Sequence, residues 1–344
     1  LFSSPRLRFS RAQQKAVLSW AKDLGATVPS YNKFRQTQDM LLAEVGDPTK
    51  RQESGRGNVW YLNEIGDSIK KDMSNLFTRS GMALYPEDAG NQLGEVWHGD
   101  KMFRDIPDHL LSPTIRHNGT IYYVNELVQC SDGSWFLPKR WMTRNTGKVM
   151  LASGFNVTEL KLLLVQDQNL EVVEVSSFES NFLQILDTTS GIYPLAAGSR
   201  MVYSIPLAVF IDDVSDNKSK QWNKHFSCYM SNGALPRTKL ENEFHVRFVA
   251  TSPFASPLEI MQGVRASIEE AFAEPVVAWD CEAKEEVLLR PYALLFAGDN
   301  PMQAELCSCA GLNTNFFCRT CQAGRTREWK QLNEGFASVL KAGP

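Results

Sequence analysis

The stretch Tyr292–Cys321 constrains the fold most, because an apolar run, an acidic turn and four of the chain's seven cysteines follow one another within it. Tyr292–Ala297 is short and apolar, which is typical of a buried strand, and Gly298-Asp299-Asn300-Pro301 ends it. Asp299 is therefore expected just past the carboxyl end of a strand. A carboxylate at such a position can bind a divalent cation.

The cysteines of this stretch have the spacing C-x-C-x8-C-x2-C and are Cys307, Cys309, Cys318 and Cys321. The last pair has the two-residue gap that lets two thiolates reach one tetrahedral Zn²⁺. We therefore expect a structural zinc site here. The alternative is that these residues are small buried side chains, since free cysteine also packs as a minor hydrophobe.

The composition is that of an ordinary globular protein, with 43% hydrophobic and 22% charged residues among 344, and it allows two or more domains. A net charge of -3 gives no overall basic field, so any nucleic-acid binding must use local patches. We see no apolar run long enough to span a membrane and no signal peptide, and expect an intracellular protein. The chain begins with Leu and ends in an unclosed helical pattern, so we expect a piece of a longer protein.

Residues 1–112 are predicted to be a mainly helical region. Helices are expected over Arg11–Leu24, from Ser30 to Val45 and over Asn63–Phe77, with a polar, basic loop at Lys50–Arg56. The first two helices with their basic flanks would suit a helix-turn-helix that contacts DNA phosphates. We favour a small helical bundle with solvated charges, because none of the side chains is diagnostic.

Residues 113–199 are predicted to be rich in β-strands. They contain a basic, aromatic cluster, whose candidate nucleic-acid-binding residues are Lys139, Arg140, Trp141 and Arg144. These side chains could stack on bases or neutralise phosphates. A solvated edge strand explains the cluster equally well.

Residues 200–321 show the order strand, strand, strand, helix, hairpin, strand. The first strand, Met201–Ile211, ends in Asp212-Asp213, with a further acid at Asp216, and the helix begins at the capping box of Ser256. This order matches the first half of a ribonuclease-H-like fold, in which the first and fourth strands lie side by side. Asp212 or Asp213 would then approach Asp299, and Mg²⁺ or Mn²⁺ would relieve the repulsion between the carboxylates. The alternative is that these acids merely end strands and face water.

The predicted fold is thus mixed α+β. It has a helical N-terminal region, a β-rich middle, a partial ribonuclease-H-like core over 200–321 with the cysteine segment, and the start of a truncated insertion helix over 322–344.

Three runs give the sequence a family resemblance: Phe210–His225, Gly298–Glu305 and Phe317-Cys-Arg-Thr-Cys321. Together they resemble fungal transposon proteins of the Plavaka kind, which are related to CACTA-type DDE transposases. The resemblance implies metal-dependent DNA cleavage and transfer at transposon ends in the nucleus by the full-length protein, in a homo-oligomer. It also implies catalysis by Asp212 or Asp213 and by Asp299.

The third acid of such enzymes is a Glu that follows an insertion beyond the CxxC pair, so we expect this chain to be inactive by itself. Glu305, Glu328 and Glu334 are the remaining candidates. Relatives are expected to have His where this chain has Cys309, and Cys is still a good zinc ligand.

Two other functions compete with this hypothesis. The first is a non-catalytic, zinc-stabilised module that binds nucleic acid or protein, in which the acids only end strands. The second is a hydrolase that uses Cys228 and His225. Their closeness in sequence is no evidence for it, because a catalytic Cys–His pair is defined by spatial geometry.

Overall fold

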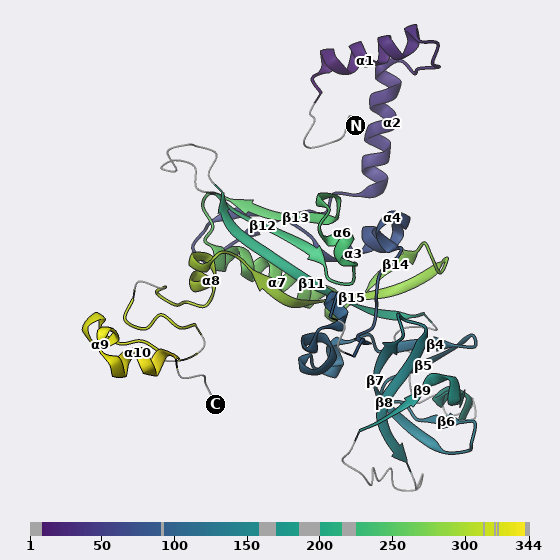
Figure 1. The fold of residues 1–344 in the computed structure, drawn as a ribbon. Coiled ribbons are helices and arrows are strands. Elements are labelled where there is room, and N and C mark those ends of the chain that lie inside the picture. The colour runs from purple at the N-terminus through teal and green to yellow at the C-terminus, as the bar shows by residue number, and fades with distance from the viewer. Residues whose placement is uncertain are drawn as a thin grey trace. The chain divides into compact units, whose positions relative to one another are not determined.

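The computed structural model describes residues 9–90, 93–157, 170–185, 200–214, 225–311, 314–319, 321 and 323–340. The chain divides into two compact units, Leu1–Pro48 and Thr49–Pro344. The fold is mixed α+β with a helical N-terminus and a β-rich middle, as predicted (Figure 1). In the described part of the chain, no helix combines the length and the apolar character that crossing a membrane requires.

The first unit contains two helices, α1 (Arg11–Asp23) and α2 (Tyr31–Val45). Serine residues begin both, as predicted: Ser10 forms a capping box with Gln13, and the Ser30 hydroxyl accepts a hydrogen bond from Lys33 N at 3.3 Å. The third predicted helix is α3 (Ile65–Ser74), which belongs to the second unit. The expected helical region of 1–112 is therefore divided between the two units.

The second unit is built on a seven-stranded sheet, which we call sheet A. Its strand order is β1 (Thr49–Glu53), β2 (Val59–Asn63), β13 (Val246–Ser252), β12 (His225–Asn232), β11 (Val202–Val214), β15 (Glu285–Ala297) and β14 (Val276–Asp280). All neighbours are antiparallel except β11 and β15, which are parallel. A parallel pair requires a long crossover, and here β12, β13, α7 (Pro257–Ala273) and β14 supply it.

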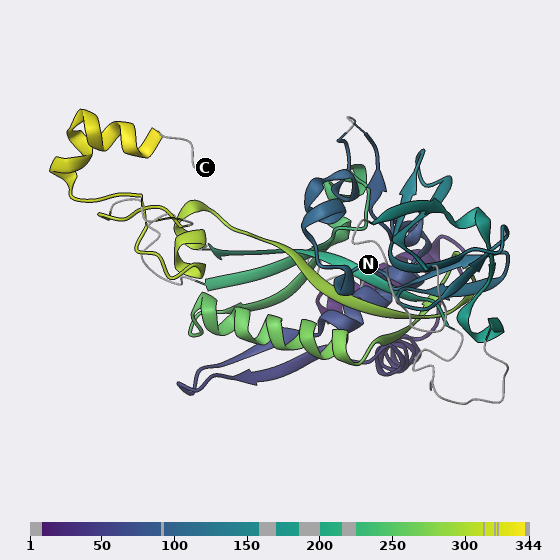
Figure 2. The same cartoon turned by 90° about the horizontal axis from the view of Figure 1, so that it is seen from below.

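Helices α3 and α7 contact the strands of sheet A and enclose the main hydrophobic core (Figure 2). The capping box predicted for α7 is present, with Ser256 as N-cap and Glu259 as its partner. Val264 and Ile268 of α7 belong to the same buried hydrophobic cluster as fully buried side chains of β11 such as Leu207 and Ile211. This burial of apolar surface is the main stabilising contribution to the unit.

Two local predictions about sheet A were wrong. The polar stretch expected to be a loop, Lys50–Arg56, includes most of strand β1, whose side chains are mostly exposed because the strand lies at the sheet edge. An edge strand with exposed side chains does not need alternating apolar residues, so the sequence lacked the pattern that would have predicted a strand there. The strand expected at Tyr292–Ala297 is also longer, because β15 continues through Pro291 from Glu285 and forms the predicted hairpin with β14.

A second sheet, sheet B, forms the β-rich middle. Its order is β10 (Phe178–Ser180), β6 (Val128–Cys130), β7 (Trp135–Arg144), β8 (Val149–Val157) and β9 (Glu171–Glu174), and β3 (Glu87–Asp88) pairs with β7. Buried Phe136, Trp141 and Phe178 pack in its core. Gly154 is required where β8 passes the bulge in β7, because a Cβ atom there would lie 2.2 Å from the Leu137 carbonyl oxygen.

Two side-chain hydroxyls complete the hydrogen bonding of β11 before its pairing with β12 begins at Leu207. Thr114 Oγ1 donates to the Val202 carbonyl at 2.9 Å and accepts from Val202 N at 2.8 Å. Ser112 Oγ accepts from Ser204 N at 3.0 Å and donates to the Leu84 carbonyl at 2.7 Å. These hydroxyls satisfy backbone groups that would otherwise be buried without partners. Thr114 begins β4 (Thr114–His117), which pairs with β5 (Thr120–Tyr123).

The remaining elements are short: α4 (Leu76–Arg79), η1 (Val96–His98), η2 (Lys101–Asp105), η3 (Asp108–Leu110), η4 (Val175–Ser177), α5 (Phe182–Ile185), α6 (Arg237–Leu240), η5 (Glu243–His245), α8 (Asn300–Leu306), α9 (Arg327–Gln331) and α10 (Asn333–Leu340).

A buried ion pair connects α4 to the β14–β15 hairpin. Arg79 donates from Nε and Nη2 to the two carboxylate oxygens of Asp280, each at 3.0 Å, and Asp280 is fully buried. We expect Arg79→Ala to destabilise the protein by about 3–5 kcal/mol, because it leaves the Asp280 charge buried without its partner. Urea unfolding measures this, with Arg265→Ala as the control, since the Arg265–Glu269 pair is exposed and is expected to contribute less than about 1 kcal/mol. Equal effects of the two substitutions would contradict the expectation.

Candidate functional site

The candidate site lies at the edge of sheet A where the parallel strands β11 and β15 both end. Their register pairs Val209 with Phe296 and Phe210 with Ala297. Asp212 lies two residues beyond Phe210 in β11, and Asp299 lies two residues beyond Ala297 at the start of α8. The carboxyl ends of parallel strands meet at one edge of a sheet, and the predicted acids therefore do lie at the same edge.

Gly298 permits the close approach of the two strands at this point. A Cβ atom at Gly298 would lie 2.9 Å from the Ile211 carbonyl oxygen and 3.0 Å from a side-chain carbon of Met302. Only glycine fits this position without displacing backbone. The spacing between β11 and Asp299 thus depends on a residue that carries no side chain.

Asp299 is exposed and is the N-cap of α8. One of its carboxylate oxygens accepts a hydrogen bond from Met302 N at 2.8 Å. Asp is a favoured N-cap residue because it satisfies an otherwise unpaired helical N–H group. This carboxylate is therefore held in a fixed position at the sheet edge.

Asp212 and Asp213 are the last acids of β11. Ile211 faces the core with no exposed surface, so Asp212 projects from the opposite face of the sheet. Asp212 is half-buried and accepts a hydrogen bond from Asp213 N at 2.8 Å, whereas Asp213 is exposed. The register thus favours Asp212 as the neighbour of Asp299, while Asp216 lies outside the described residues.

Asp212 of β11 is paired with Ser227 of the neighbouring strand β12. The Ser227 hydroxyl lies 3.0 Å from the Thr251 hydroxyl on β13. Next to Asp212 therefore come the hydroxyl of the buried Ser227 and that of the exposed Thr251. Carboxylate oxygens are the donors that Mg²⁺ and Mn²⁺ prefer. In the part of the chain that the structure describes, no group of three or more His, Cys, Asp or Glu side chains is placed to hold one metal ion.

The cysteine segment follows α8. Cys307 and Cys321 are exposed, and Cys309 and Cys318 are half-buried. As placed, these thiols do not form a tetrahedral zinc set, since no metal-binding group of three occurs among the described residues. The segment is nevertheless close to the acidic edge, because Arg319 donates to the Asn300 side chain at 3.4 Å.

Most of the basic, aromatic cluster of β7 is engaged inside the protein. Trp141 is only 1% exposed and donates to the Pro113 carbonyl at 3.0 Å, so it offers no face on which a base could stack. Arg140 binds Asp108 at 2.6 Å and the Phe103 and Ile106 carbonyls. The structure thus gives Trp141 and Arg140 a role in holding sheet B to the segment before it.

Lys139 and Arg144 are the other two residues of that cluster. Lys139 donates to the Asn125 side chain at 2.7 Å, and Arg144 forms an exposed ion pair with Asp88 at 2.9 Å. The side chains of the cluster therefore make contacts within the protein, and the charged groups of Lys139 and Arg144 are partly exposed.

The structure excludes a Cys228 hydrolase. Cys228 has no exposed surface and lies in the core of sheet A. This burial raises the pKa of its thiol to about 12. The reactive thiolate is therefore not formed near neutral pH, and a substrate has no access to the sulfur.

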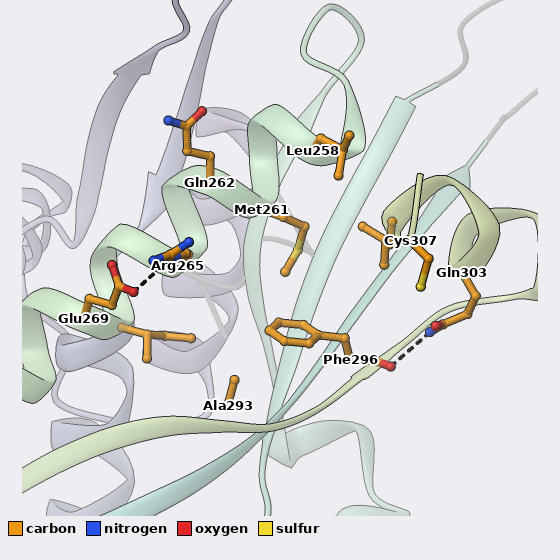
Figure 3. Close-up of a pocket in the computed structure, with 11 residues that line it drawn as sticks. Leu258, Met261, Gln262, Arg265, Glu269, Ala293, Phe296, Gln303 and Cys307 are labelled. Atoms are coloured by element: carbon orange, nitrogen blue, oxygen red, sulfur yellow. Dashed lines mark hydrogen bonds and ion pairs between the residues drawn. The ribbon is translucent and has the colours of Figure 1, made fainter. Parts of the chain in front are cut away.

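Sequence reasoning missed an apolar groove of about 770 Å³ lined by α7, β15 and α8 (Figure 3). Leu258, Met261, Phe296 and Leu306 contribute much of its apolar lining, and Arg265 pairs with Glu269 at 2.7 Å on its rim. Three separate segments, on α7, β15 and α8, form this groove. Their joint position follows from the tertiary packing, and no local pattern in the sequence signals it.

We expect Gly298→Ala to destabilise the protein and to move Asp299 away from Asp212, because the added methyl group meets the Ile211 carbonyl. A loss of about 1–3 kcal/mol is expected, as for overpacking of a core. Urea unfolding measures it, and Gly94→Ala is the control, since a Cβ atom there meets nothing within 4 Å. A Gly298→Ala variant as stable as Gly94→Ala would show that the strands do not approach as closely as described.

We expect Cys307, Cys309, Cys318 and Cys321 to bind one zinc ion, as their spacing in the sequence predicts. Metal analysis of the purified protein should find about one Zn²⁺ per chain, and Cys318→Ser or Cys321→Ser should remove it. Cys281→Ser is the control, because Cys281 lies in the β14–β15 turn outside the cysteine segment. A wild-type protein without zinc would contradict this expectation.

Comparison with known proteins gives one match. A family model described as a domain of unknown function, DUF8591, matches residues 114–231, which run from the start of β4 into β12. Neither the curated proteins nor the solved structures contain a match.

Proposed function

We propose that residues 200–321 form the first part of a ribonuclease-H-like core of a DDE-type transposase or a domesticated derivative. Support comes from the central strand order β13-β12-β11-β15, from the parallel β11–β15 pair, and from the crossover that passes through α7. The observation that carries the proposal is the parallel register of that pair, whose last paired residues are Phe210 and Ala297; Asp212 and Asp299 each follow two residues later. The proposed substrate is DNA at transposon ends, and the proposed location is the nucleus.

Asp212 and Asp299 would be the ligands of the catalytic Mg²⁺ or Mn²⁺. Such an ion activates the attacking water or 3′-hydroxyl and stabilises the departing oxygen of the phosphodiester. Within the protein, β11 and the N-cap hydrogen bond from Met302 N keep the two carboxylates in place. Preorganised donors need little rearrangement when a cation binds between them.

Enzymes of this type require a third acid. In the described residues no further carboxylate completes a group of three at this edge. We therefore propose that the chain binds a divalent ion weakly and needs a Glu from elsewhere in the full-length protein for strand cleavage.

A second candidate is a non-catalytic binding module stabilised by the cysteine segment. The observation that favours it is the role of Asp299 as the N-cap of α8, because this role explains the carboxylate without any metal. The two proposals differ in whether the carboxylate pair binds Mn²⁺.

Mn²⁺ binding to the full chain, measured by electron paramagnetic resonance, tests the proposal. We expect Asp299→Asn to weaken binding by at least about tenfold, a loss of about 1.4 kcal/mol, without loss of stability. Asn is as good an N-cap as Asp, so this substitution removes the charge and keeps the cap. Asp212→Asn should have the same effect on Mn²⁺ binding.

The control for these variants is Asp105→Asn, which removes an exposed carboxylate at the end of η2. Equal Mn²⁺ binding by wild type, Asp299→Asn and Asp105→Asn would refute the nuclease-like site and leave the binding module as the better account. In the full-length protein, Mn²⁺-dependent nicking of supercoiled DNA that survives Asp299→Asn would also contradict the proposed role of this acid.

A further inference from the structure

Part of sheet A carries aromatic side chains on the face that lies opposite helices α3 and α7. Phe210 is 40% exposed, Phe248 is 44% exposed, and Tyr229 is half-buried. Phe210 follows Val209 and precedes Ile211, which both belong to the core on the helix side, so its ring points to the other face. A sheet face that meets only water normally carries polar residues, so these exposed rings indicate a binding surface.

Phe210, Tyr229 and Phe248, which we call the aromatic row, stand next to one another on three neighbouring strands. The register pairs Phe210 of β11 with Tyr229 of β12, and Tyr229 with Phe248 of β13. The ring centres of Tyr229 and Phe248 are 5.7 Å apart. A hollow of about 350 Å³ lies beside the row, and Val246 and Ala297 contribute to its lining. Strand pairing within sheet A therefore fixes the whole surface.

The spacing of the aromatic row matches the repeat of a polyproline II helix. Neighbouring strands are about 4.8 Å apart, so Phe210 and Phe248 are separated by two such spacings, about 9.6 Å. A polyproline II helix has three residues per turn and rises about 3.1 Å per residue, which gives about 9.3 Å per turn. A segment in this conformation that crosses the strands therefore brings residues i and i+3 to Phe210 and Phe248. An α-helix, with a pitch of about 5.4 Å, lacks this repeat.

The chemistry of the aromatic row also suits a proline-rich segment. Aromatic rings are the groups against which proline rings pack in known grooves of this kind. The carbonyl groups of polyproline II make no internal hydrogen bonds, so the Tyr229 hydroxyl can donate to one of them. Asp212 lies two residues beyond Phe210 on the same face, and Asp213 beside it is exposed. A basic residue next to the prolines would therefore meet opposite charge.

We propose that the aromatic row binds a proline-rich segment of a partner protein, in the polyproline II conformation and with a basic residue beside the prolines. This binding requires no divalent ion and does not rest on the proposed nuclease-like site. Nucleic acid fits the surface less well, because the neighbouring carboxylates repel phosphates. Arg51, which is paired with Tyr61 on the same face, forms an ion pair with Glu53 at 2.7 Å and adds no net positive charge.

Fluorescence anisotropy tests the proposal with the full chain, in buffer without added Mg²⁺ or Mn²⁺. The probe is a labelled decaproline with an arginine at each end, and a peptide of equal length with Gly and Ser in place of the prolines is its control. We expect the proline peptide alone to bind. Phe210→Ser and Phe248→Ser should each weaken binding by at least about tenfold, whereas Phe77→Ser, at an 80% exposed position of α4, should leave it unchanged.

Two milder variants separate binding from folding. Tyr229→Phe keeps the ring and removes the hydroxyl donor, and it should weaken binding by about threefold. Asp212→Asn should weaken binding of the arginine-flanked peptide by about fivefold and leave that of plain decaproline unchanged. Urea unfolding should show that both variants are as stable as wild type.

Several outcomes would overturn the proposal. Equal binding of the proline peptide and its control would do so, and so would equal binding of the proline peptide by wild type and Phe210→Ser. An oligodeoxythymidine that binds more tightly than the proline peptide, and whose binding Phe210→Ser weakens, would identify nucleic acid as the occupant. A concentration-dependent dimer that Phe210→Ser dissociates would identify a second copy of the chain instead.

Discussion

The parallel pairing of β11 with β15 is the contact on which the second unit depends. It joins strands from distant parts of the sequence, and the strands and helix between them form the crossover that the pairing requires. It buries the central side chains of the core, such as Leu207 and Val209. It also brings Asp212 and Asp299 to one edge of the sheet, so the same pairing that stabilises the fold also creates the candidate site.

Polar contacts fix the other elements around this sheet. Asp72 of α3 is almost fully buried, and it binds Arg247 of β13 and the Asn232 side chain of β12. Its burial raises the pKa of this carboxyl, and the nearby Arg247 guanidinium opposes that shift. Such pairs add little net stability compared with apolar contacts, but each is costly to break. They therefore specify where α3 lies on the sheet more than how strongly it is held.

Much of sheet A was predictable because its signals are local. The capping box at Ser256, the apolar run before Asp212 and the charged turn between β14 and β15 each depend on neighbouring residues, and the structure contains all three. The predicted order of strands also placed the acids of β11 and β15 at one edge. The features that could not be predicted depend on contacts between distant residues. Strand β1 is polar because it lies at an edge, and Trp141 is buried by segments remote in sequence.

The hydroxyl contacts of Ser112 and Thr114 have a consequence for the boundaries of the folded unit. The matched family region begins at Thr114 and ends within β12. A fragment with these limits would keep Thr114 but lose Ser112, and it would lack β15 altogether. Strand β11 would then show its apolar residues along an open edge, which is the arrangement that promotes aggregation between chains. The region that is similar in sequence is thus smaller than the compact unit, which also includes Ser112, the earlier elements β2 and α3, and β15.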